Sequence, residues 1–145
     1  MTTLAFDKLA IRETIEDYLN FLDAKNWEGI ASCFSEDSKA WYNHEPQTLK
    51  GGQGVANFLR RIEAYGSTDH ALSNLHIVVK GDTATCDSRL TASLHFGTER
   101  EGTISVRAIW YRDKLRRLGD RWVIYERHHE PQWQYDVPSR TPHLL

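Results

Sequence analysis

Hydrophobic residues in the first half of the chain recur at the spacing of amphipathic helices. Between residues 11 and 22 they fall at i, i+4, i+7, i+8 and i+11, on one face of a helix: Ile11, Ile15, Tyr18, Leu19 and Leu22. Asp7 is the predicted N-cap of this helix, because its short carboxylate can accept free N–H groups of a first turn. A shorter helix is expected over residues 27–34 and a strand around residues 41–42. A third helix is expected to follow the GGQG segment at residues 51–54 and to end at Gly66.

From residue 70 onward the hydrophobic period changes to two, which is the period of β-strands. Strands are predicted over residues 70–79, 83–96, 103–111 and 122–129. They are separated by turn or loop segments at residues 81–82, 97–102 and 118–120. Helices followed by a run of antiparallel strands are typical of an α+β domain, in which the helices pack on a curved sheet.

The strand over residues 70–79 has one apolar and one mixed face. Because side chains alternate along a strand, His70, Asn74 and His76 are expected on one face, together with Leu72 and Val78. The opposite, apolar face is expected to contain Leu75, Ile77 and Val79. A mixed face is either a hydrated outer surface or the wall of a pocket, and a β-bulge would reverse the assignment of faces.

Composition narrows the class of protein. The chain has 145 residues, of which 40% are hydrophobic and 26% charged, with a net charge of -2. These values predict one soluble domain over residues 1–145 and argue against nucleic acid as a partner. We expect a cytoplasmic protein without membrane contact, since no segment is apolar over a bilayer-spanning length and the first residues, MTTLAFDKLA, do not resemble a signal peptide. Cys33 and Cys86 lack metal-ligand spacing and are expected to serve in packing.

Several short motifs follow one another in an order that resembles a known family. They include YxxxxD at Tyr18 and Asp23, HxxxN at His70 and Asn74, and the segment YRDKLRRLGDRWVIYERHH at residues 111–129. Together they resemble the SnoaL-like branch of the nuclear transport factor 2-like superfamily. The resemblance implies a cone-shaped, curved antiparallel sheet wrapped by three N-terminal helices, with a pocket that opens into the cone.

The resemblance also implies a catalytic pair formed by Asp23 and His70. From helical spacing alone, Asp23 lies at the border of the apolar face, where a solvated acid and an acid paired with histidine are both open. In the implied pair, Asp23 accepts a hydrogen bond from one ring nitrogen of His70, and the other nitrogen acts as a general base. Tyr18 and Tyr42 are expected to polarise a substrate carbonyl or assist a leaving group. No metal or other cofactor is expected.

Two further polar residues are candidates for substrate binding. Asn74 is predicted on the pocket side of its strand, where it either contacts substrate or satisfies backbone groups. His95 lies on the polar face of the strand over residues 83–96, and this face is either hydrated or directed toward the pocket. The adjacent residues His128 and His129 should point in opposite directions, which argues against a shared metal ion.

The resemblance implies a small-molecule lyase or isomerase, with a dehydratase-like proton abstraction from an apolar, cyclic substrate. One alternative is a non-catalytic small (beta) subunit of an aromatic-ring-hydroxylating dioxygenase, because residues 112–129 resemble such subunits as well. Another is a ligand-binding accessory protein. The resemblance further implies a homodimer or homotrimer.

Overall fold

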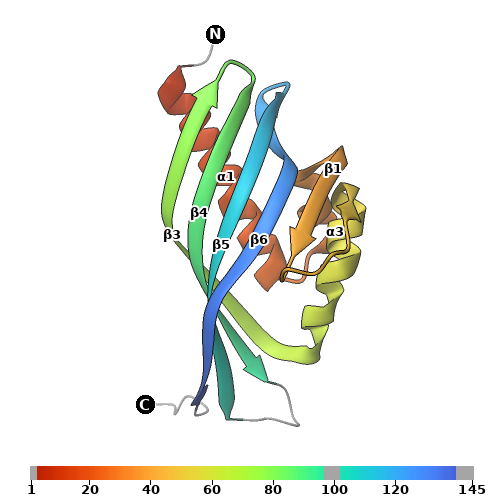
Figure 1. The fold of residues 1–145 in the computed structure, drawn as a ribbon, viewed down its shortest axis with the longest axis vertical. Coiled ribbons are helices and arrows are strands. Elements are labelled where there is room, and N and C mark those ends of the chain that lie inside the picture. The colour runs from red at the N-terminus through yellow and green to blue at the C-terminus, as the bar shows by residue number, and fades with distance from the viewer. Residues whose placement is uncertain (1–2, 97–101, 140–145) are drawn as a thin grey trace.

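The computed structural model describes residues 3–96 and 102–139, which form helices followed by a curved six-stranded sheet (Figure 1). The helical segments are α1 (Leu4–Asp23), α2 (Trp27–Ser32), α3 (Gly51–Leu59) and the 3-10 helix η1 (Arg60–Ala64). The strands are β1 (Phe34–Tyr42), β2 (Leu49–Lys50), β3 (Tyr65–Lys80), β4 (Thr83–Phe96), β5 (Thr103–Leu118) and β6 (Arg121–Pro138). The predicted α+β class is confirmed.

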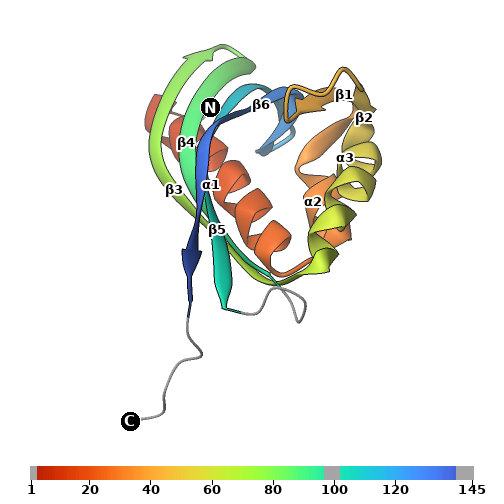
Figure 2. The ribbon, with the colours of Figure 1, turned by 60° about the horizontal axis from the view of Figure 1, so that its bottom comes forward.

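The sheet has the strand order β2-β1-β6-β5-β4-β3. Neighbouring strands are antiparallel, as predicted, except for β1 and β6, which pair in parallel. The long strands curve around α1, while α2 and α3 lie on the side of β1 and β2 (Figure 2). Helix α1 therefore lies on the concave face of the sheet and supplies buried residues to a core shared with the strands.

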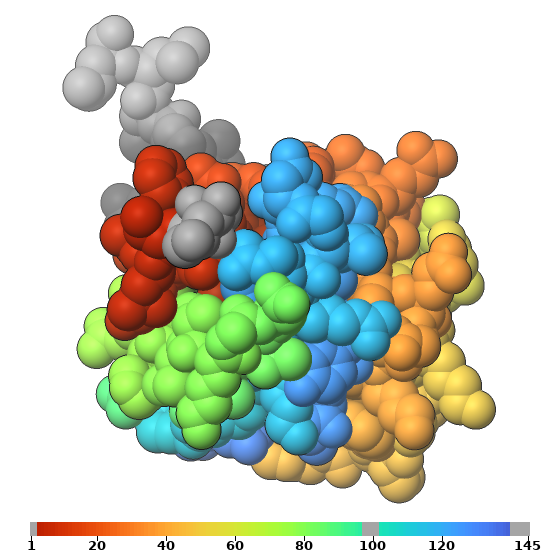
Figure 3. All heavy atoms as spheres, turned by 90° about the horizontal axis from the view of Figure 1, so that it is seen from above, coloured from red at the N-terminus to blue at the C-terminus, as the bar shows by residue number. Residues whose placement is uncertain are grey.

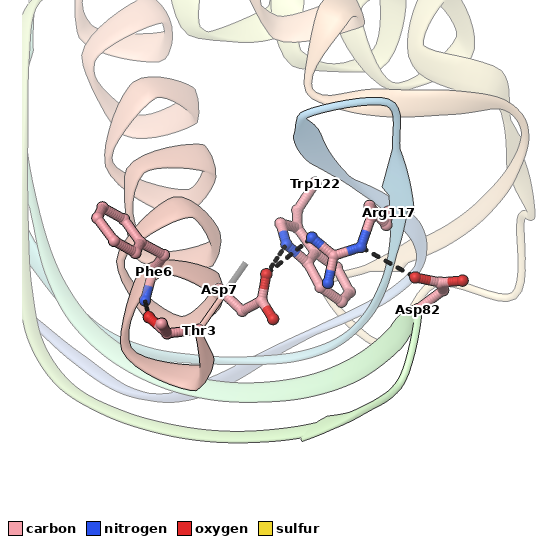
Figure 4. Close-up of polar contacts among 6 residues, drawn as sticks. All are labelled: Thr3, Phe6, Asp7, Asp82, Arg117 and Trp122. Carbon is pink, nitrogen blue, oxygen red and sulfur yellow. Dashed lines mark hydrogen bonds and ion pairs between the residues drawn. The ribbon is translucent and has the colours of Figure 1, made fainter. Parts of the chain in front are cut away.

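The start of α1 differs from the prediction. Thr3 is the N-cap, since its Oγ1 accepts a hydrogen bond from the backbone N–H of Phe6 at 3.2 Å. Asp7 lies one turn further on, buried, where its carboxylate accepts hydrogen bonds from Arg117 Nη1 at 2.8 Å and from Trp122 Nε1 at 3.4 Å (Figure 4). A carboxylate is favourable in the first turn of a helix. Asp7 occupies that turn, but it binds residues of the sheet instead of capping the helix.

Arg117 connects three segments at this end of the molecule. Its side chain contacts Asp7 of α1 and also Asp82, at 2.9 Å, in the turn between β3 and β4. The first turn of α1 (red), the β3–β4 turn (green) and the β5–β6 turn (blue) lie side by side in Figure 3. The partly shielded ion pair between Arg117 and Asp7 therefore holds this end of the curved sheet against the helix.

Helix α3 begins at Gly51, earlier than predicted, and Gly66 lies inside β3. Gly51 has a φ of +68°, a left-handed conformation that makes the sharp turn from β2 into α3. At Gly52 a Cβ atom would lie 2.1 Å from the carbonyl oxygen of Ala31 in α2, so only glycine permits this close approach of the two helices. The GGQG segment is thus the first turn of the helix and not the loop before it.

A β-bulge in β3 changes which side chains face the core. Leu72 pairs with Leu90 of β4 and Leu75 pairs with Ser88, so three residue steps on β3 oppose two on β4. His70 and Leu72 therefore share the inner face with Leu75 and the apolar residues that follow it. The predicted shared face of His70 with Asn74 and His76 is wrong, because the bulge turns the latter two outward.

The bounds of β4 agree with the prediction, whereas β1, β3, β5 and β6 are longer than predicted and α2 ends at Ser32. Cys33 caps α2, and both Cys33 and Cys86 are buried free thiols, in agreement with a packing role. The predicted loop over residues 97–102 lies outside the described residues except for Gly102. No helix in the described ranges is long and apolar enough to cross a membrane.

The close contact between α2 and α3 can be tested with two glycine variants. Gly52→Ala should lower the free energy of unfolding by about 2 kcal/mol or more, because the new methyl group meets backbone atoms that cannot move alone. Gly54→Ala is the matched control, since its Cβ would have only an ordinary contact at 3.7 Å and should raise stability by about 0.5–1 kcal/mol. Urea unfolding followed by circular dichroism measures both. Equal stability of the two variants would contradict the proposed contact.

Candidate active site

A cavity of about 540 Å³ lies between the C-terminal half of α1, the α3–η1 segment and the inner face of the sheet. Its apolar wall includes Leu22, Phe58, Leu94, Phe96 and Ile109. Its polar groups come from α1, η1, several strands and the residue after β1, and they include Tyr18, Tyr42, Arg61, His70, Arg107, Tyr111 and His129. A largely apolar hollow with a few convergent polar groups is typical of a site for a small molecule.

Asp23 and His70 are in contact, as the resemblance implied, and the ring of His70 lines this cavity. Asp23 is the last residue of α1, and His70 lies in β3. The distance from His70 Nδ1 to Asp23 Oδ1 is 2.6 Å, and the backbone N–H of His70 donates to Asp23 Oδ2 at 2.9 Å. Thr68 Oγ1 donates a further hydrogen bond to Asp23 Oδ1 at 2.9 Å. The Asp23 carboxylate thus contacts three polar groups, two of which belong to His70.

These contacts keep the Asp23 carboxylate ionised. Burial on its own would raise the pKa of Asp23, but the hydrogen bonds from the ring and backbone of His70 outweigh it, with a smaller contribution from Thr68, and lower the pKa. An ionised carboxylate at Nδ1 favours the tautomer of His70 with hydrogen on that nitrogen, so Nε2 is left as the acceptor. The ring lines the cavity and its side chain is only 6% exposed, so the imidazole is largely shielded from bulk water.

Tyr18 and Tyr42, which the resemblance implied as pocket residues, both line the cavity. Their hydroxyl oxygens are 2.8 Å apart, and Arg127 Nη1 donates to Tyr42 Oη at 3.4 Å. Since a guanidinium can only donate, Tyr42 accepts this bond and its own hydrogen is available to Tyr18. Burial raises the pKa of both phenols, which keeps them protonated as hydrogen-bond donors.

Arg127 and Asp113 form a completely buried ion pair beneath the phenols, which the sequence analysis missed. Arg127 Nε and Nη2 each donate to a different carboxylate oxygen of Asp113 at 2.7 Å. The guanidinium also lies 3.9 Å from the ring centroid of Tyr111 and 4.3 Å from that of Tyr18. Burial alone would lower the pKa of Arg127, but Asp113 outweighs it and holds the pKa well above its usual value. The pair therefore places a permanent positive charge behind the tyrosines.

His129 is a second imidazole of the cavity that sequence analysis did not assign. The backbone N–H of Asn43 donates to His129 Nδ1 at 3.3 Å, so this nitrogen carries no hydrogen, and Nε2–H is the donor in the neutral ring. Burial lowers the pKa of His129 to about 3, and the charge of Arg127 contributes to the shift. His128 points the other way and stacks on Trp41, in agreement with the predicted alternation.

Asn74 and His95 are not part of the cavity. Asn74 lies in an outer depression of the sheet with His76, beyond the bulge in β3. His95 lies between Leu94 and Phe96, both of which line the cavity, so alternation directs the His95 side chain to the opposite face of β4. The predicted substrate-binding role of these two residues is therefore not supported. No group of three or more His, Cys, Asp or Glu side chains suited to a metal ion occurs in the described parts of the chain.

Comparison with solved structures identifies the class of fold. A candidate scytalone dehydratase from Novosphingobium aromaticivorans DSM 12444 has a TM-score of 0.80 and 24% identity, covering 92% of this chain and 89% of that one. A hexachlorocyclohexane dehydrochlorinase, LinA type 2, has a TM-score of 0.77 and 19% identity over 94% and 96% of the two chains. An NTF2-like protein with a cystatin-like fold, also from Novosphingobium aromaticivorans, has a TM-score of 0.74 and 26% identity over 87% and 82%. The fold is NTF2-like.

A family comparison is more specific. Residues 4–128 match the SnoaL-like domain family, a range that includes both members of the Asp23–His70 pair and most of the cavity wall. The chain belongs to the SnoaL-like domain family.

The buried, neutral state of His129 predicts a specific acid sensitivity. Its folded pKa of about 3 lies below the ordinary value of 6.5, so its contribution to stability is complete above pH 6.5 and is lost as pH falls toward 3. His129→Gln should reduce the acid-induced loss of unfolding free energy by up to about 1.4 kcal/mol per pH unit in this range. Urea unfolding at several pH values measures the slope. The outward-facing variant His128→Gln should keep the wild-type slope, and the same slope in His129→Gln would contradict the assignment.

Proposed function

We propose that the protein is a cofactor-independent lyase or isomerase that removes a proton from a small, largely apolar cyclic substrate. The observation that carries the proposal is the 2.6 Å contact between Asp23 and His70 at the wall of the cavity. If Asp23 were only a solvated acid at the end of α1, it would not need to contact a histidine. A carboxylate that orients a histidine toward an apolar hollow is the arrangement that general-base catalysis requires.

The proposed reaction begins with a C–H bond next to a carbonyl group. His70 Nε2 takes the proton, the C–H electron pair becomes the C=C bond of an enolate, and the ionised Asp23 stabilises the imidazolium. In a dehydration, the enolate re-forms the carbonyl and expels hydroxide from the adjacent carbon, and the imidazolium returns its proton to make water. In an isomerisation, the same proton is delivered to another carbon. Both routes restore neutral His70.

Tyr18 and Tyr42 are proposed to stabilise the oxygen of the enolate or of the leaving group. Their phenols remain protonated, and the charge of Arg127 behind Tyr42 strengthens donation along the pair. Donors fixed in a cavity before the substrate arrives need little rearrangement as negative charge develops. Neutral His129 offers one more donor, Nε2–H, to the same hollow.

The structural neighbours support an elimination or isomerisation over other chemistry. Two of them carry the names of a dehydratase and a dehydrochlorinase, which are both eliminating enzymes. The oriented Asp23–His70 pair favours an enzyme over the alternatives of a dioxygenase small subunit or a ligand-binding accessory protein, since neither of these needs a positioned base.

The base can be tested before the natural substrate is identified. Cyclic ketones and hydroxyketones incubated with the protein in deuterated water should gain deuterium, detected by mass spectrometry, at the carbon that His70 deprotonates. With an active compound, His70→Ala should lower the rate by about 10²–10⁴ and Asp23→Asn by about 10² or more. Asn74→Ala, on the same strand but facing outward, is the matched control. A wild-type rate in His70→Ala, with the fold intact by circular dichroism, would rule out the mechanism.

Removal of the phenol groups should affect turnover more than substrate binding. Tyr18→Phe is expected to lower kcat by about 10²-fold with a smaller change in KM, because the lost hydrogen bond is strongest when the oxygen carries negative charge. Tyr125→Phe, whose ring lies beneath Arg116 and outside the cavity, is the control and should keep wild-type kinetics. Steady-state kinetics of the two variants provide the comparison. An unchanged kcat in Tyr18→Phe would exclude a role for this phenol in the reaction.

A further inference from the structure

Arg107 places a cationic group in the cavity, on the opposite side of β4 from His70. Ala92 of β4 pairs with His70 of β3 on one side and with Arg107 of β5 on the other. The three residues therefore form one row across the sheet and share its inner face. Their spacing puts the backbones of His70 and Arg107 about 10 Å apart, two strand separations.

The guanidinium of Arg107 is engaged only by neutral groups among the described residues. Its Nη2 donates to Tyr65 Oη at 3.1 Å, and its Nε approaches Ser105 Oγ at 3.4 Å. These contacts use two of the five N–H donors of the side chain. The described residues that line the cavity include no aspartate or glutamate, so no carboxylate of the wall balances this charge.

The other arginines in and behind the cavity are balanced. Arg61 pairs with Glu45 at 3.2 Å, and Arg127 pairs with Asp113 at 2.7 Å. His129 is neutral near physiological pH, because burial holds its pKa at about 3. Among the cavity-lining arginines, Arg107 is thus the one that has no acidic partner within the described part of the chain.

We propose that Arg107 binds a carboxylate group of the substrate, so that the cavity accepts a ring acid in preference to the corresponding neutral compound. A guanidinium presents parallel N–H donors that match the two oxygens of a carboxylate, and the apolar wall strengthens this attraction. The carboxylate lies at the β5 side of the cavity, and the ring extends toward His70. This inference rests on the proposed function for the identity of the reacting carbon, but the binding preference does not require turnover.

The preference is measured with a matched pair of probes, naphthoate and naphthamide, which have the same ring and differ in charge. Isothermal titration calorimetry at low salt should show that the wild-type protein binds naphthoate at least tenfold more tightly, equivalent to about 1.4 kcal/mol. Arg107→Gln should bind the two probes with nearly equal affinity. Arg107→Lys, which keeps the charge but loses the planar fork, should keep part of the preference.

Two control variants separate this inference from the proposed reaction. Arg61→Gln removes a balanced arginine of the same cavity and should keep the preference for naphthoate. His70→Ala removes the proposed base without removing Arg107, and it should keep the preference even though turnover is lost. Equal binding of the two probes by the wild-type protein, a preference that survives in folded Arg107→Gln, or no measurable binding of naphthoate would overturn the inference.

Discussion

Carboxylates near both ends of α1 hold the helix across the concave face of the sheet, and the cavity depends on this attachment. Asp7 in the first turn is bound by Arg117 and Trp122, and Asp23 at the last residue is bound by Thr68 and His70. A 20-residue helix spans about 30 Å, so the two contacts are far apart and together fix its direction. Asp23, which orients the proposed base, therefore also attaches the end of α1 to the sheet. The same contacts set the position of His70 and stabilise the fold.

Much of the fold could be predicted from local patterns, because helical and strand periods are properties of short segments. The apolar face of α1 and the boundaries of β4 agree with the spacing of their hydrophobic residues. Errors occurred where a long-range contact determined the outcome. Asp7 has the chemistry of a cap, but a partner more than a hundred residues away in the chain recruits it. The glycines at the start of α3 resemble a loop until the close carbonyl of α2 is known.

The candidate site was predictable only in part, for the same reason. The pairing of Asp23 with His70 came from resemblance, since helical spacing left Asp23 at the border of the apolar face. Asp113 carried a readable signal, because it interrupts an apolar alternation formed by Ile109, Tyr111 and Leu115. Its partner Arg127 could not be found without the register of β5 and β6, which contains two irregularities. The position of Arg107 in the same row as His70 likewise requires the register of β3, β4 and β5.

The β-bulge in β3 divides this strand into two halves, and the residues that face the interior alternate differently in each half. Before it, His70 faces the interior; after it, the apolar residues continue inward while Asn74 and His76 meet solvent. A regular strand of the same composition could not satisfy both halves, because burying the apolar half would turn the imidazole outward. Loss of one residue at this bulge would make the strand regular, so with the apolar half still buried His70 would face away from the cavity. The access of the proposed base to the cavity thus depends on the length of β3 as well as on the identity of residue 70.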